Sequence, residues 1–156
     1  MNKYLICLSV FLNLLYVVSS SGVKNYSLFE ELKKVRDEDI EIRLQFSCHT
    51  TDNEQRRILS PRLDMFSLEE ISEVVENWYD ENQKVTLNFV PFKKFELSSS
   101  KIVDLFDPKK VFIKISYVDF HDFVKKEGLL DKEIHQIQDF VESLRNSGFN
   151  LAYRNK

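Results

Sequence analysis

Cysteine is scarce in this chain, whose 156 residues include only Cys7 and Cys48. Two cysteines exclude a disulfide framework and a metal site built from four cysteines of this sequence. The C-x-x-C and H-E-x-x-H patterns are also absent, and the three histidines, His49, His121 and His135, are too scattered to indicate a metal site.

An excess of positive charge is lacking as well. The chain has 22 Lys and Arg against 25 Asp and Glu, a formal net charge of -3. Nonspecific binding to nucleic acid draws on a broad basic field, so this class of function is not favoured. With 43% hydrophobic and 30% charged residues, the composition indicates a single globular domain with a real core.

A hydrophobic run long enough to cross a membrane is missing too. The apolar run from Tyr4 to Val18 is interrupted twice, whereas a transmembrane helix needs about 20 predominantly apolar residues. We therefore divide the chain into a hydrophobic N-terminal segment, residues 1–15, and a folded part, residues 16–156.

Two interpretations of the N-terminal region remain open. Lys3 before the apolar run and small residues after it are typical of a secretory signal peptide, so if residues 1–21 are cleaved the protein is secreted. Cleavage would leave Cys48 as a lone thiol in an oxidising compartment. Alternatively, residues 16–23 are a short buried strand ending in a Ser/Gly turn, and the protein is cytoplasmic.

Helix starts are marked by the capping-box pattern, Ser or Thr followed three residues later by Glu. The pattern occurs at Ser27, Thr51 and Ser67. The third box opens the clearest amphipathic helix, whose apolar face places Trp78 in the core. A last helix is expected to begin at Asp131 and to stop at Gly148, with His135 at its solvent edge.

Short runs rich in β-branched and aromatic residues lie between these helices and predict strands. Besides residues 16–23, the runs are Ile40–Phe46, Val85–Val90, Val111–Val118 and Phe149–Arg154. Strands that alternate with helices favour parallel pairing, so the sequence predicts an α/β fold.

The strand that begins at Ile40 leads into three residues of interest. Side chains alternate between the faces of a strand, which places Ser47 and His49 on the polar face and Cys48 on the packed one. Because ligands of α/β sheets gather at strand carboxyl ends, Ser47 and His49 are candidates for binding one small molecule. The alternative interpretation is an ordinary polar strand terminus.

The segment LQFSCHTTDNEQRRILSP, residues 44–61, resembles the strand and following helix of radical S-adenosylmethionine (SAM) enzymes, nearest to the ribosomal and transfer RNA adenine-C2 methyltransferases. Four other segments resemble the family in the same order, so the likeness covers about residues 16–156. They are Val18–Val23, Lys84–Val90, Val111–Asp119 and Ser147–Arg154.

The resemblance implies a partial parallel (β/α) barrel of about five strands, with helices on its outer face. It implies S-adenosylmethionine as the cofactor, with contacts at Ser19, Ser47, Cys48, His49 and Asp119. Asp119 stands where the family has asparagine, and an ionised carboxylate accepts hydrogen bonds but cannot donate them.

The family's C-x-x-x-C-x-x-C loop, its Gly-Glu-Pro turn and its C-terminal catalytic cysteine have no counterparts here. A [4Fe–4S] cluster needs thiolate ligands, so we do not expect one in this chain. We expect the C-terminal part of a barrel that is inactive alone, with self-association through its open side or a missing N-terminal half supplied in trans. Only the resemblance to this family suggests RNA as a substrate. The alternatives are one half of a split enzyme and a small secreted binding protein.

Overall fold

The computed structural model describes residues 7–11, 15–36, 40–81, 83–117 and 134–153. The strands are β1 (Cys7–Phe11), β2 (Leu15–Ser20), β3 (Ile42–Ser47), β4 (Val85–Phe89), β5 (Val111–Ile115) and β6 (Asn150–Tyr153). The helices are α1 (Tyr26–Arg36), α2 (Asn53–Leu59), α3 (Leu68–Trp78), α4 (Ser99–Leu105), the 3-10 helix η1 (Ile134–Ile137) and α6 (Gln138–Asn146).

All six strands form one sheet in the order of the sequence, β1 to β6. Strands β2 to β6 are parallel, which confirms the five predicted parallel strands. Strand β1 lies within the hydrophobic segment 1–15 and pairs antiparallel with β2. This pairing occupies an edge of β2 that would otherwise expose unpaired backbone groups.

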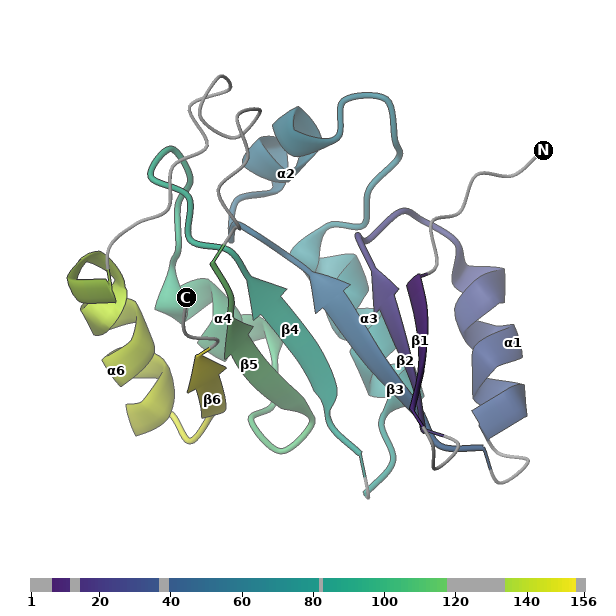
Figure 1. Ribbon diagram of the computed structural model, residues 1–156. Coiled ribbons are helices and arrows are strands. Elements are labelled where there is room, and N and C mark those ends of the chain that lie inside the picture. The colour runs from purple at the N-terminus through teal and green to yellow at the C-terminus, as the bar shows by residue number, and fades with distance from the viewer. Residues whose placement is uncertain (1–6, 12–14, 37–39, 82, 118–133, 154–156) are drawn as a thin grey trace.

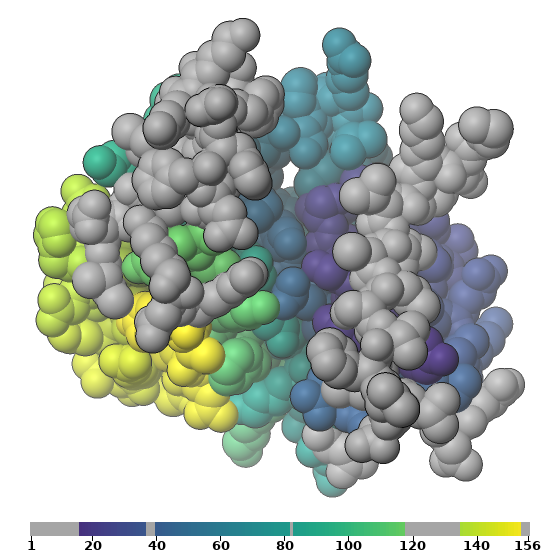
Figure 2. Space-filling model, viewed as in Figure 1, coloured from purple at the N-terminus to yellow at the C-terminus, as the bar shows by residue number. Residues whose placement is uncertain are grey.

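The sheet and its helices make a partial (β/α) barrel, as predicted. Helices α3 and α4 lie behind the sheet in Figure 1, α1 and α6 flank it, and α2 lies beyond the carboxyl ends of the strands. The opposite face of the sheet is turned toward the viewer, and Figure 2 shows atoms of β2 to β5 on it. Among the described residues, no helix is long and apolar enough to span a membrane.

The core lies between the sheet and the helices, because apolar and polar side chains alternate along the strands and the apolar ones face the helices. In β3, Ile42, Leu44 and Phe46 are at most 3% exposed, and Arg43 and Gln45 lie on the opposite face. The apolar face of α3 packs on the same core, and its members are Leu68, Ile71, Val74, Val75 and Trp78. The core position predicted for Trp78 is therefore confirmed.

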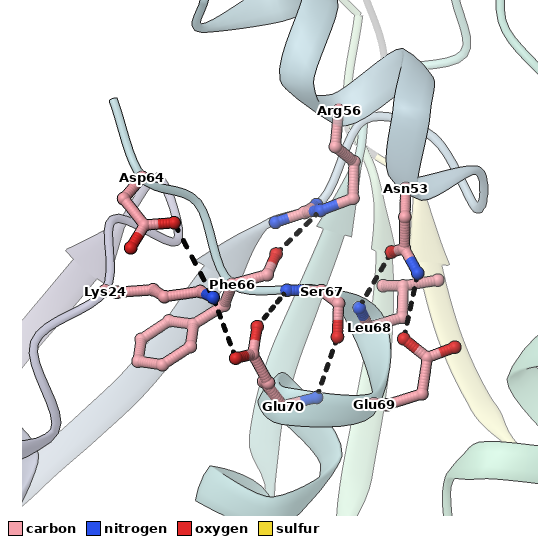
Figure 3. A network of polar contacts seen from close by, with 9 residues as sticks. All are labelled: Lys24, Asn53, Arg56, Asp64, Phe66, Ser67, Leu68, Glu69 and Glu70. Carbon is pink, nitrogen blue, oxygen red and sulfur yellow. Dashed lines mark hydrogen bonds and ion pairs between the residues drawn. The ribbon is translucent and has the colours of Figure 1, made fainter. Parts of the chain in front are cut away.

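The capping box at Ser67 is confirmed. The Ser67 hydroxyl accepts a hydrogen bond from the Glu70 amide at 3.2 Å, and the Glu70 carboxylate accepts one from the Ser67 amide at 2.7 Å, as Figure 3 shows. Asn53 adds a further contact, since its side-chain oxygen accepts from the Leu68 amide at 3.0 Å. These contacts satisfy amide groups that the first turn of α3 leaves unpaired.

The other two predicted caps were wrong by one or two residues. Ser27 lies inside α1, and the Asn25 side chain accepts from the amide of Leu28 at 3.1 Å. Asp52, and not Thr51, caps α2 by accepting from the Gln55 amide at 2.8 Å. Asparagine and aspartate are as good at this position as serine or threonine, so the pattern alone could not choose between adjacent candidates.

The C-terminal helix ends as expected. Gly148 follows α6 with a φ of +88°, a conformation that glycine adopts without steric cost. His135 is exposed, as predicted. The predicted start at Asp131 and the predicted contact residue Asp119 lie outside the described residues.

Candidate functional site

The candidate site begins where β3 ends. Ser47 is the last residue of the strand and pairs with Asn88 of β4 on the polar face of the sheet. The Cys48 amide donates to the Asn88 carbonyl at 2.8 Å, which continues the parallel ladder by one residue. The Cys48 side chain points the other way and is 1% exposed, so its predicted packing is confirmed.

A tight turn centred on His49 follows the strand. The Thr50 amide donates to the Cys48 carbonyl at 2.7 Å, and His49 between them has a φ of +62°. Positive φ is uncommon for a residue with a side chain, and turns closed by such an i to i+2 bond are rare and strained. Strain of this kind costs about 1–3 kcal/mol and is concentrated at functional sites in proteins.

A cavity of about 170 Å³ lies beside this turn. It is lined by Ser21, Ser47, Cys48, His49, Arg56, Leu59, Ser60, Met65 and Phe92. The fold therefore brings three of the predicted contact residues, Ser47, Cys48 and His49, to one cavity at the strand ends. Ser19 does not line it.

Ser19 belongs instead to a polar network on the open face of the sheet. Its hydroxyl accepts from the Gln45 side-chain amide at 3.1 Å, and the Gln45 carbonyl oxygen accepts from the Lys114 ammonium at 3.5 Å. On the next strands, the Ser116 hydroxyl donates to the Asn88 side chain at 2.7 Å. These side chains give the inner face of the partial barrel a polar surface.

The chemistry of His49 is set by its surroundings. Burial, and secondarily the positive charge of Arg56, lower the pKa of His49 from 6.5 to about 4. The imidazole is therefore neutral at pH 7. Its Nδ1 atom is buried and has no hydrogen-bond partner among the described residues. A neutral ring of this kind has a hydrogen-bonding position left for a ligand.

Cys48 is not a reactive thiol in this environment. Burial raises its pKa to about 11, although the nearby Arg56 charge acts in the opposite direction. The thiolate is the form that attacks electrophiles and binds metals, so a protonated, buried thiol does neither. Within the described residues, no group of three or more His, Cys, Asp or Glu side chains is arranged to hold a metal ion.

Arg56 is a residue of this site that the sequence analysis missed. It is 2% exposed, and it donates from Nη1 to the Cys48 carbonyl at 2.7 Å and from Nε to the Phe66 carbonyl at 3.2 Å. The adjacent Arg57 is exposed, and both lie in a charged helical segment. No local pattern in the sequence distinguishes the buried arginine from the exposed one.

Comparison with known proteins identifies relatives of the chain, although no family model matches it. A probable dual-specificity RNA methyltransferase RlmN of Christiangramia forsetii is 31% identical over 77 residues, which is 49% of this chain and 20% of the relative. Proteins of the same description from Pseudothermotoga lettingae and Flavobacterium johnsoniae are each 26% identical, over 80% and 88% of this chain. The chain spans 36% and 38% of those two relatives.

A solved structure agrees with these matches at the level of the fold. The crystal structure of a radical SAM methyltransferase from Sphaerobacter thermophilus superposes with a TM-score of 0.60 and 16% sequence identity. The match covers 88% of this chain and 39% of that protein. By the order of its segments, its parallel sheet and these matches, the chain is a methyltransferase-like relative of the radical S-adenosylmethionine superfamily.

Proposed function

We propose that the chain binds S-adenosylmethionine with the carboxyl-end wall of its partial barrel and does not catalyse a radical reaction alone. One observation carries the proposal: the strained turn at His49 holds Ser47 and His49 beside a cavity at the ends of parallel strands. Strand carboxyl ends are the general location of ligands in α/β folds.

The polar groups of the site fit part of such a ligand. The Ser47 hydroxyl and the unpartnered Nδ1 of His49 offer hydrogen bonds to the hydroxyl groups or ring nitrogens of an adenosyl group. Pockets for drug-sized ligands measure about 300–1,000 Å³, so a cavity of about 170 Å³ takes only part of one. The remainder would lie along the polar inner face beside Ser19 and Gln45. When bound, S-adenosylmethionine supplies an activated sulfonium.

The residues do not fit the iron–sulfur cluster that radical chemistry requires. Such a cluster is held by cysteine thiolates, and the sequence contains two cysteines, of which Cys48 is buried with a raised pKa. Binding of the ligand and catalysis are separate in this proposal.

Calorimetric titration with S-adenosylmethionine and S-adenosylhomocysteine tests the binding proposal. We expect saturable binding by the unaltered protein, and Ser47→Ala should weaken it about 3- to 10-fold, the equivalent of one hydrogen bond. His135→Asn is the matched control for His49→Asn, because His135 is exposed and does not line the cavity. If neither ligand binds the unaltered protein at millimolar concentration, the proposal is wrong.

Anaerobic reconstitution tests the second half of the proposal. Purified protein is incubated with iron and sulfide, desalted, and then given S-adenosylmethionine and dithionite. We expect no stoichiometric iron absorbance and no 5′-deoxyadenosine. Reductive cleavage at any rate above the protein-free control would refute the statement that the chain is inactive alone.

We further propose that a second polypeptide covers the open face of the sheet and completes a barrel. The polar side chains of β2 to β5 support this, because an enclosed barrel interior needs such groups to meet a ligand. The relatives are more than twice as long as the part that this chain matches. Co-expression with a tagged segment that carries a three-cysteine loop tests the proposal by co-purification. Recovery of the chain as a homo-oligomer, with no tagged segment bound, would contradict it.

A further inference from the structure

Arg56 carries a buried positive charge without an acidic partner among the described residues. Its Nη1 and Nε atoms donate to the backbone carbonyls of Cys48 and Phe66, and its Nη2 atom has no partner among the described residues. Figure 3 shows the guanidinium lying above Phe66 and separate from the carboxylates of Glu69 and Glu70.

The position of this guanidinium is fixed on several sides. The two carbonyl contacts orient it, and the backbone of Gly22 approaches it closely. A Cβ atom at Gly22 would lie 2.7 Å from Nη2, so any side chain there would force the guanidinium to shift from this position. Gly22 also has a φ of +88°, a conformation that favours glycine. Its lack of a side chain leaves room for the guanidinium of Arg56.

The arrangement is costly unless something balances the charge. Moving a cation from water into a protein interior costs several kcal/mol even after relaxation, and carbonyl dipoles offset only part of that cost. A buried N–H group without an acceptor adds its own penalty of about 1–3 kcal/mol. An anion in the adjoining cavity would reduce both costs at once.

The cavity has the groups that an oxyanion needs. Besides Arg56, its lining includes the hydroxyl-bearing residues Ser21, Ser47 and Ser60, and the neutral His49. Its volume of about 170 Å³ corresponds to several waters at about 30 Å³ each, which is room for a carboxylate or a phosphate group. None of the described residues that line it is acidic, so no carboxylate among them opposes an anion.

We propose that this cavity is an oxyanion subsite, in which Arg56 supplies the charged donor and the serine hydroxyls complete the contacts. Its ligand is a carboxylate or phosphate group of a small molecule. The subsite does not depend on the adenosyl ligand proposed above, since a free anion can occupy it.

Nuclear magnetic resonance with inorganic phosphate and with acetate tests the proposal at constant ionic strength, with chloride as the reference. A bound anion beside His49 favours the imidazolium form. We therefore expect the pKa of His49 to rise by at least ~1 and to level off as the anion concentration increases. The ring signals of the exposed His135 provide the internal control and should not depend on which of the three salts is present. No saturable change in either anion would overturn the proposal.

Two variants separate a binding role from a structural one. Arg56→Lys keeps the charge but loses two carbonyl contacts and could unfold the protein. Ser21→Leu instead narrows the cavity from an exposed position without touching those contacts, and it should weaken anion binding at least tenfold. Ser100→Leu, an exposed serine on α4, is its matched control and should have no effect. Unchanged anion binding in folded Ser21→Leu protein would overturn the assignment to this cavity.

Adenosyl compounds distinguish the source of the anion. S-adenosylhomocysteine has a carboxylate, whereas 5′-methylthioadenosine has none. If S-adenosylhomocysteine binds more tightly than 5′-methylthioadenosine, and Ser21→Leu removes that difference in affinity, the occupant is the carboxylate of an amino-acid moiety. A response to phosphate with no difference between the two nucleosides identifies free phosphate. Failure of S-adenosylmethionine and of both nucleosides to bind would refute the proposed function, while a response to phosphate would still support the subsite.

Discussion

Replacing His49 with asparagine should flatten the pH dependence of stability between pH 6.5 and about pH 4. In the folded protein the pKa of His49 is lowered from 6.5 to about 4, so the folded state binds this proton less readily than the unfolded state. Stability from this group is therefore complete above pH 6.5 and is lost as the pH falls toward 4. A tenfold change in proton affinity is worth about 1.4 kcal/mol, which gives about 2–3 kcal/mol over this range.

Urea denaturation followed by the fluorescence of Trp78 measures this contribution at pH 7.5 and pH 4.5. Carboxylates also titrate in this range, so the quantity of interest is the difference between the unaltered protein and His49→Asn. Asparagine tolerates the positive φ of +62° at this position, which limits other effects of the substitution. We expect the unaltered protein to lose about 2 kcal/mol more than the variant. Equal losses in the two proteins, with His135→Asn as the control, would refute the burial and neutrality assigned to His49.

Four further outcomes are expected. Ser67→Ala should lower the free energy of unfolding by about 1 kcal/mol, since it removes the cap of α3. Leu44→Ala should cost about 2–5 kcal/mol in the same urea assay, whereas Val103→Ala on an exposed position should be close to neutral. Peptide mapping should find Cys48 alkylated only after unfolding, because the thiol is buried and its pKa is about 11; rapid labelling of the native protein would contradict this. Intact-mass measurement of the folded protein should find residues 1–21 retained, because their loss would remove β1 and β2 from the sheet.

Most of the fold was predictable because the strands carry their pattern locally. In β3 the alternation of Ile42, Leu44 and Phe46 with polar residues fixes which face is buried, and every parallel strand matched a run of β-branched or aromatic residues. The capping box at Ser67 and the core position of Trp78 follow from helical spacing in the same way. Strand ends were less well predicted, since the expected strand over residues 16–23 stops at Ser20.

Features that lack a clear local pattern were not predicted. Strand β1 lies in the hydrophobic segment 1–15, for which no strand was expected, because its strand character comes from pairing with β2. The short helix α4, capped by Ser98, is too brief to show a clear period. Thr51 was taken for a helix cap, but its hydroxyl donates to the Glu96 carbonyl at 3.3 Å and accepts from the Ser98 amide at 2.7 Å. The two Thr51 contacts join residues that are 45 and 47 positions apart in the chain.

The site shows why ligand binding and catalysis can be separated in such a chain. The groups that hold the strained His49 turn all come from these 156 residues: the Asn88 carbonyl extends β3, the Thr50 amide closes the turn, and Arg56 donates to the same Cys48 carbonyl that the turn uses. The Cys48 carbonyl thus receives two donors, the Thr50 amide and the Arg56 side chain of α2. The thiolates of an iron–sulfur cluster have no such source in the sequence. The geometry of the His49 turn is therefore fixed by contacts within the described residues, independently of any cluster ligand.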